Sequence, residues 1–348
     1  MYKPRSLWEF GFLGAVGAQA VVITILEVFM LLRYQRWVNP SAYDMTRAYT
    51  IPLNVGLFVF GCWWLLLLTT DAVSAKNNIQ LFALCVCNAC LFGVNVMRYD
   101  QTSETAEELL TAANGLVKPD FSYWDVVEPA IITSIVWVGV STLSMCGLAF
   151  KLHRDFAWEI YKHVSANVDL RRRYLAYQVF LVLMKLGVYF FIAFLVLYGV
   201  INVHYAMPEF AIVMALIPAA LLQISLAVYS ARKENKFGMA VVILLFFTAA
   251  GYVASRFVVM VNGSDRSNTL LKGEMLLFAL VAFLFVAATF GNAIQCMINF
   301  NHGLKPIFQR QEGLQKLQDE EDSYRLDNLL RMNASTMDIL KSKRFSID

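Results

Sequence analysis

The chain has 348 residues, of which 58% are hydrophobic and 16% are charged, and its mean hydropathy is +0.55. A soluble domain is usually only about 45 to 50% apolar even when glycine is counted, so this composition indicates a multispanning membrane protein. The net charge of +3 is too small to indicate a nucleic-acid-binding surface, and all six cysteines fall within apolar stretches, which argues against a disulfide framework.

Eight apolar segments are long enough to cross a membrane as helices. They cover residues 10–33, 51–73, 79–98, 126–150, 174–200, 208–230, 237–261 and 273–299. Backbone groups in lipid must find hydrogen bonds within the protein, and runs of this length favour helices over barrel strands. The sequence therefore predicts an all-α, polytopic transmembrane helical bundle over residues 1–300. A partly disordered cytosolic tail is expected over residues 301–348.

Loop charges predict the orientation of the bundle. Basic residues precede the first span and lie between spans 2 and 3, 4 and 5, and 6 and 7, whereas residues 100–128 carry seven acids and one lysine. The positive-inside rule then places the basic loops and both termini in the cytosol, although Arg36 and Arg47 in the first lumenal loop oppose this assignment. Asn262 begins an Asn-Gly-Ser pattern on the lumenal side and is a candidate glycosylation site.

Two ionisable residues stand out within the predicted spans, Lys185 and Glu27. By helical rise Lys185 lies about 16 Å from Tyr174, which is about half of a hydrocarbon core of about 30 Å. Its side chain cannot easily reach either surface and should face protein or a polar cavity. Glu27 is the candidate partner of Lys185, although the two depths differ by about 9 Å.

Arg171, Arg172 and Arg173 form a basic block directly before the fifth span, after a plausible interfacial amphipathic helix at residues 156–170. Such a basic collar is expected to favour anionic lipids by about 1 kcal/mol per charge near the surface. The plainer alternative is that the arginines only anchor the orientation of the chain.

Three stretches of the sequence carry a family pattern. They are Asp71–Ala72 with Lys76–Gln80, Arg172–Tyr174 with Tyr177–Phe180 and Leu183–Lys185, and the residues Asn292–Ala293, Cys296–Met297, Asn299–Asn301 and Gly303–Pro306. Together they resemble a fungal family of uncharacterised Golgi apparatus membrane proteins. The resemblance covers spans 2 to 8 and implies residence in the Golgi or another endomembrane, with no known activity. It also implies an acid two positions after the lysine of span 5, where this chain has Gly187, so Glu27 gains importance as a countercharge.

No catalytic order of Ser, His and Asp, no metal-ligand spacing and no Gly-rich phosphate loop is found, so we expect no enzyme, no cofactor and no metal site. The leading hypothesis is a non-catalytic Golgi protein with a lipid-interacting, scaffolding or trafficking role. Its expected partners are anionic lipids on the cytosolic side and proteins that bind the tail over residues 302–348, with no nucleic acid. One alternative is a small-solute or proton-coupled transporter that uses Lys185 and Glu27, although no inverted repeat is found. Another is a heptahelical receptor-like protein in which the first span is an addition to spans 2–8.

Overall fold

The computed structural model describes residues 6–39, 46–111, 117–118, 122–163, 168–203, 207, 209–262 and 272–300. Eight long helices account for almost all of this part of the chain: α1 (Leu7–Trp37), α2 (Thr50–Ser74), α3 (Asn78–Thr111), α4 (Trp124–His163), α5 (Val168–Leu197), α6 (Glu209–Arg232), α7 (Lys236–Val261) and α8 (Lys272–Ile298). Each contains a stretch long and apolar enough to cross a membrane. The predicted all-α polytopic bundle is therefore confirmed. The expectation for the tail falls on residues 301–348, outside the described residues.

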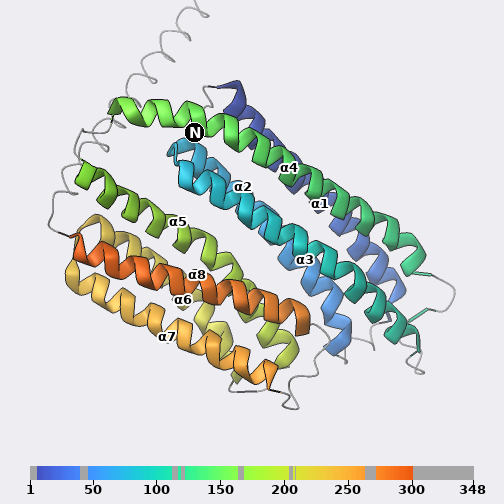
Figure 1. The fold of residues 1–348 in the computed structure, drawn as a ribbon. Helices are drawn as coiled ribbons and strands as arrows, with labels where there is room; N and C mark the ends of the chain where they lie inside the picture. Colours follow the sequence, from blue (N-terminus) through green and yellow to red (C-terminus); the bar gives the residue numbers. More distant parts are fainter. Residues whose placement is uncertain are drawn as a thin grey trace, which may run out of the picture.

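The eight helices form two groups of four, which Figure 1 shows side by side. In the first half α1 packs against α2 and α4, and α3 also packs against α2 and α4, so the four helices form a closed ring. In the second half α5 to α8 form the same ring in the same order. The halves meet where α2 and α3 face α5, and where α3 contacts α8.

The second hairpin of each half has the same turn. One residue adopts a positive φ, Lys76 (48°) or Glu234 (52°), and the following asparagine, Asn77 or Asn235, accepts hydrogen bonds from the first turn of the next helix. The N–H groups of residues 75, 76, 77 and 81 donate to the carbonyls of residues 71, 73, 72 and 77, and those of residues 233, 234, 235 and 239 donate to residues 229, 231, 230 and 235. The two patterns coincide when the chain is shifted by 158 residues, from residue 77 to residue 235. Because four helices separate equivalent positions, the halves run in the same direction, as in a parallel repeat.

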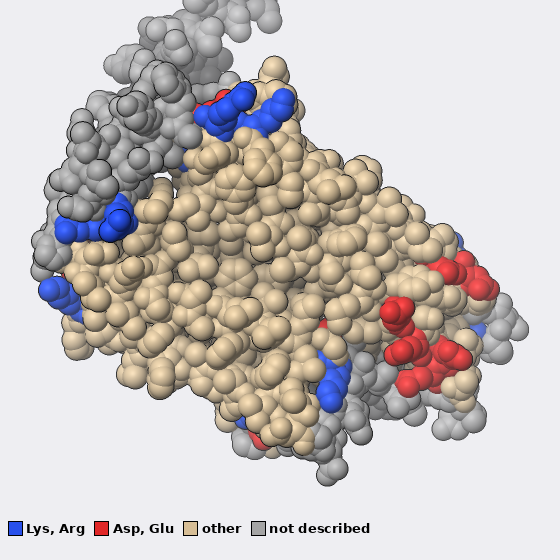
Figure 2. Space-filling model, in the orientation of Figure 1, with Lys and Arg blue, Asp and Glu red and all other residues tan. Residues whose placement is uncertain are grey.

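Charged side chains gather at opposite ends of the bundle (Figure 2). The basic end comprises the α2–α3 and α6–α7 turns, the last part of α4 and the first turns of α5, with Lys76, Lys151, Arg154, Arg172 and Lys233. The acidic end comprises the last turns of α3 and the first turns of α4, with Asp100, Glu104, Glu107, Asp125 and Glu128.

A small cap of aromatic and aliphatic residues covers the acidic end of the first half. Within it the rings of Trp37 and Tyr123 stack at 4.9 Å, and the Tyr34 hydroxyl donates to the carbonyl of Ala48 at 2.8 Å. Burial raises the pKa of the Tyr123 hydroxyl, which therefore remains a neutral group. The cap exists because α3 continues to Thr111, well past the end of its apolar stretch.

Candidate functional site at the boundary between the halves

One face of α2 lines the boundary between the halves together with α3. Leu57, Gly61, Trp64, Leu68 and Asp71 recur every three or four residues and so lie on the same side of the helix. The Tyr189 hydroxyl of α5 donates to the carbonyl of Leu57 at 3.3 Å, and the Trp64 indole N–H donates to the carbonyl of Lys185 at 3.2 Å. This face therefore positions α5 against the first half.

An ion pair joins the halves toward the basic end. The Lys185 Nζ lies 2.5 Å from Oδ2 of Asp71, and Gln80 of α3 donates to the same oxygen at 2.9 Å. The two charged side chains are 30% and 43% exposed, so the pair is not sealed inside the protein. Asp71 lies three residues before the end of α2, or about 4.5 Å by helical rise. We call this group of three side chains the basic latch.

The prediction that Glu27 is the partner of Lys185 is wrong. The countercharge comes from Asp71, near the end of α2. Gly187 could not supply it, because a Cβ atom at position 187 would lie 2.9 Å from the Cβ of Phe285 on α8. That side of α5 is occupied by the tight contact between α5 and α8.

Glu27 instead forms a buried ion pair with Arg98 in the first half. The two terminal nitrogens of Arg98 donate to the two carboxylate oxygens of Glu27 at 2.7 and 2.8 Å, and the side chains are 8% and 0% exposed. The ring of Phe58 covers the guanidinium at 4.7 Å. Glu274, from the first turn of α8, lies close enough for electrostatic interaction with Arg98 and within hydrogen-bonding reach of the Asn54 amide. We call these four polar residues, Glu27, Asn54, Arg98 and Glu274, the acidic-end cluster.

Aromatic side chains close the boundary between the basic latch and the acidic-end cluster. Tyr189 contacts the rings of Phe60, Phe190 and Phe278, with centroids 5.1 to 6.3 Å apart. At Gly61 a Cβ atom would lie 2.5 Å from the Tyr189 hydroxyl oxygen, so only glycine permits this approach of α5 to α2. The two halves thus contact each other closely at this position.

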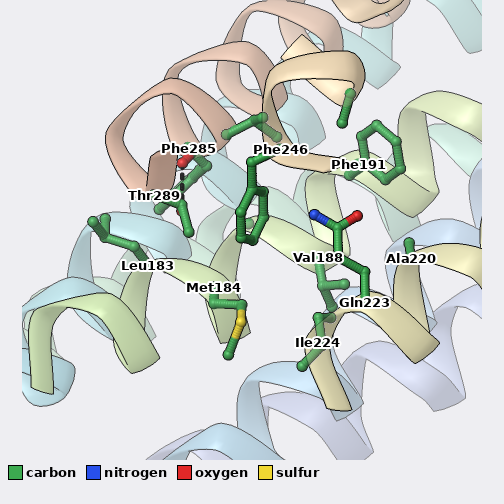
Figure 3. A pocket seen from close by; sticks show the side chains of 13 residues that line it. Leu183, Met184, Val188, Phe191, Ala220, Gln223, Ile224, Phe246, Phe285 and Thr289 are labelled. Atoms are coloured by element: carbon green, nitrogen blue, oxygen red, sulfur yellow. Dashed lines mark hydrogen bonds between the residues drawn. The ribbon is translucent and has the colours of Figure 1, made fainter. Parts of the chain in front are cut away.

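A cavity of about 40 Å³ lies inside the second half and not at the boundary (Figure 3). Its walls come from α5 to α8 and are apolar except for Gln223 and Thr289. The Thr289 hydroxyl donates to the carbonyl of Phe285 at 2.6 Å, whereas Nε2 of Gln223 is buried without a partner in the described part of the chain. Such walls suit an apolar group better than a polar solute. Within the described residues no group of three His, Cys, Asp or Glu side chains could hold a metal ion.

The chain is similar to a Golgi membrane protein of fission yeast. That protein of Schizosaccharomyces pombe, named UPF0658 Golgi apparatus membrane protein, is 24% identical over 274 residues, which are 74% of this chain and 78% of the relative. The resemblance expected from the three sequence stretches is confirmed. Together with the eight membrane-spanning helices, it makes this chain a multi-pass membrane protein of the Golgi or endomembrane system. No protein-family model and no solved structure matches the chain.

The remaining predicted site residues lie at the two ends of the bundle. Arg171 to Arg173 belong to the first turns of α5 at the basic end, where Arg172 is exposed and Arg173 is half-buried. Asn262 is the exposed C-cap of α7 at the acidic end. The structure thus places the arginines and the glycosylation pattern at opposite ends, as the loop charges predicted. Lipid binding by the arginines and glycosylation of Asn262 stay predictions.

Proposed function

We propose that the protein is a small-solute transporter in which the two four-helix halves rock against each other. The observation that carries the proposal is the basic latch, an ion pair between Asp71 of the first half and Lys185 of the second within apolar membrane-spanning helices. Charged side chains inside membrane spans are costly, and they commonly mark solute or ion pathways. A pair that connects two separately packed bodies can break when those bodies move apart.

The repeated architecture supports this proposal. Several transporter folds consist of two halves related by an axis along the membrane normal, and their substrates bind at the boundary between the halves. Here both halves close their own ring of four helices, and their second hairpins share one turn geometry. Such halves can move as rigid bodies because each keeps its internal contacts.

Alternating access needs a closure at each end of the boundary and a point about which the halves tilt. Two polar groups and one aromatic layer are suited to these roles. The basic latch closes one end, and the contact of Glu274 with the Arg98 region closes the other. Asn54 and Asp71, the α2 residues of these two groups, are 17 residues or about 25 Å apart. The ring of Tyr189 lies between them and can serve as the point about which the halves tilt.

We place the basic end in the cytosol by the positive-inside rule. The receptor-like hypothesis needs α1 to be an addition to a seven-helix bundle, yet α1 packs against both α2 and α4 as one member of the first ring. The scaffolding hypothesis depends largely on the tail and stays a separate prediction.

Cysteine accessibility tests the movement without knowledge of the solute. Leu68 is 6% exposed and lies one turn from Asp71 on the boundary face of α2. In liposomes, Leu68→Cys should react slowly with a membrane-impermeant maleimide added at the basic end. Adding Lys185→Met should raise the rate severalfold, because the latch can no longer hold the end closed. The charge exchange Asp71→Lys with Lys185→Asp should restore the slow rate.

Ala75→Cys is the matched control, because Ala75 is exposed at the C-cap of α2, in the turn at the basic end. Its rate should not respond to Lys185→Met. Equal labelling of Leu68→Cys with and without Lys185 would refute the latch and the rocking movement. In parallel, uptake of small polar solutes into proteoliposomes should be lost in Lys185→Met.

A further inference from the structure

We infer that the Glu274 carboxyl is a proton-binding site at the boundary between the halves. That this proton controls the rocking movement rests on the proposed transport function, whereas proton binding itself does not. Glu274 is absent from the sequence-based candidates because it stands at the very start of its apolar span.

Glu274 is held inside the protein although it belongs to the first turn of α8. The residue is 1% exposed, and its Oε1 has no hydrogen-bond partner in the described ranges. The turn packs closely against α3, because a Cβ atom at Gly273 would lie 3.1 Å from the Met97 methyl group. Asn54 of α2 is the polar neighbour within hydrogen-bonding reach. A carboxyl group at this boundary is therefore shielded from water while the halves are together.

Burial opposes a charge on Glu274, whereas the nearby Arg98 guanidinium attracts its carboxylate. The charged and titratable groups that act on this region are Arg98 of α3, Glu27 of α1, Tyr123 before α4 and Tyr189 of α5. Both terminal nitrogens of Arg98 are already used by the two oxygens of Glu27. One guanidinium thus faces two acids, and an ionised Glu274 would leave one buried negative charge without a partner of its own. A bound proton removes that charge.

A proton fits this position better than a metal ion. The cavity beside Arg98 measures only about 10 Å³, which is about the space for one water molecule. A hard cation needs roughly six oxygen ligands and would also lie near the positive guanidinium. A proton needs one carboxylate oxygen and no additional space.

Binding and release of the proton change the contact across the boundary. When the acidic end is open to water, the neutral carboxyl can release its proton to water and become a carboxylate. The carboxylate remains in water, because burying it beside Glu27 would leave a negative charge without a partner of its own, and so it holds the acidic end open. Taking up a proton from water removes this charge and allows the acidic end to close, which permits opening at the basic end. Proton movement and rocking are coupled in this way.

Infrared spectroscopy tests the proton directly. The full-length protein in lipid nanodiscs should show the carbonyl band of a buried protonated carboxyl at neutral pH, and Glu274→Gln should lack it. Glu128→Gln is the control, because Glu128 lies at the acidic end and accepts a hydrogen bond from Tyr99 at 2.8 Å; it should keep the band. Glu27→Gln should lose the band as well, since Arg98 would then ionise Glu274. A band of unchanged size in Glu274→Gln, or none in the unmodified protein, would overturn the inference.

The labelling assay tests the coupling. After division by the rate of Ala75→Cys, which corrects for thiol reactivity, the Leu68→Cys rate should fall severalfold as the pH at the acidic end rises, because the carboxylate holds that end open and the basic end closed. Glu274→Gln should keep the same rate at every pH. A carboxyl band without any pH effect on labelling would retain the proton site and remove the coupling. A labelling rate that never responds to Lys185→Met would remove the transport function, and the infrared result would still decide whether Glu274 binds a proton.

Discussion

Arg98 and Glu27 form the most thoroughly buried charge pair among the described residues. Two parallel hydrogen bonds of 2.7 and 2.8 Å join them, and Phe58 excludes water from one face. Burying two charges is expensive, so such a pair adds little net stability compared with an apolar pair of similar volume. Losing one partner is different, because the other charge then remains buried without compensation.

Arg98→Met should therefore reduce the free energy of unfolding by about 3 to 5 kcal/mol, measured by denaturant titration of the protein in detergent micelles. The double variant Glu27→Gln with Arg98→Met should recover more than half of this loss. Arg256→Met is a matched control, because the shift of 158 residues carries position 98 to position 256 in α7. The Arg256 side chain donates to the neutral Tyr198 hydroxyl at 3.2 Å and lies over the rings of Tyr198 and Tyr252, so about 1 kcal/mol should be lost. Equal losses in both single variants would contradict this account.

At this scale the sequence identified the charges but not their partners. Lys185 and Glu27 were recognisable because each interrupts an apolar stretch. Their partners Asp71 and Arg98 stand at the ends of predicted spans, where charged residues are ordinary, and sequence alone does not say which helices are neighbours. One signal was available, since Asp71 continues the three-to-four-residue spacing of Leu57 on α2.

The contact between α2 and α5 depends on the absence of a side chain at one position. Gly61 brings the backbone of α2 against the hydroxyl of Tyr189, while the same hydroxyl donates to Leu57 one turn earlier. Small residues allow helices in membranes to approach closely. Here the close approach also fixes the position of the Tyr189 ring along the boundary.

Gly61→Ala should reduce the free energy of unfolding by about 1 to 3 kcal/mol, because the new methyl group overlaps the tyrosine ring. Gly56→Ala on the same helix should be neutral or stabilising by up to about 1 kcal/mol, since no atom lies within 4 Å of a Cβ atom there. Combining Gly61→Ala with Tyr189→Phe should recover part of the loss. Thermal unfolding monitored by tryptophan fluorescence compares the variants, and similar melting temperatures for the two alanine variants would argue against the close contact.

The presence of the helices was predictable, because an apolar stretch that is long enough to cross the membrane is expected to form a helix. Each of the eight stretches recognised from hydropathy corresponds to one long helix of the structure. The helix ends were less predictable, and α3 shows why. The helix continues to Thr111 because Ala106 and Leu109, which follow Arg98, pack into the cap. The segment beyond Arg98 is nevertheless too polar to be recognised as a membrane span from the sequence.

The whole molecule has a separation of charge along its long direction, with the basic block of α5 at one end and the acids of α3 and α4 at the other (Figure 2). This separation agrees with the orientation expected from the loops. The parallel repeat could not be predicted in the same way, because Asn77 and Asn235 are the main residues that the two turns share. Outward-facing positions need only be apolar, so the two halves can diverge in sequence while keeping their geometry.

Replacing Arg171, Arg172 and Arg173 together with glutamine should reduce the anionic lipid that purifies with the protein severalfold, because each charge near the surface contributes about 1 kcal/mol. Native mass spectrometry of the protein extracted from mixed liposomes measures the bound lipid. Lys272→Gln at the start of α8, at the acidic end, should leave lipid binding unchanged. Unchanged lipid content in the triple variant would assign the arginines to orientation alone.

The turns at residues 75–77 and 233–235 are short. These two connections at the basic end therefore expose little chain to which a soluble protein could bind. Among the described residues, the end of α4 and the beginning of α5 offer more surface for recognition at this end. For the same reason these turns are poor insertion sites for a fluorescent protein or an affinity tag. An insertion would separate the two helices of each hairpin, because the second helix begins directly after the capping asparagine.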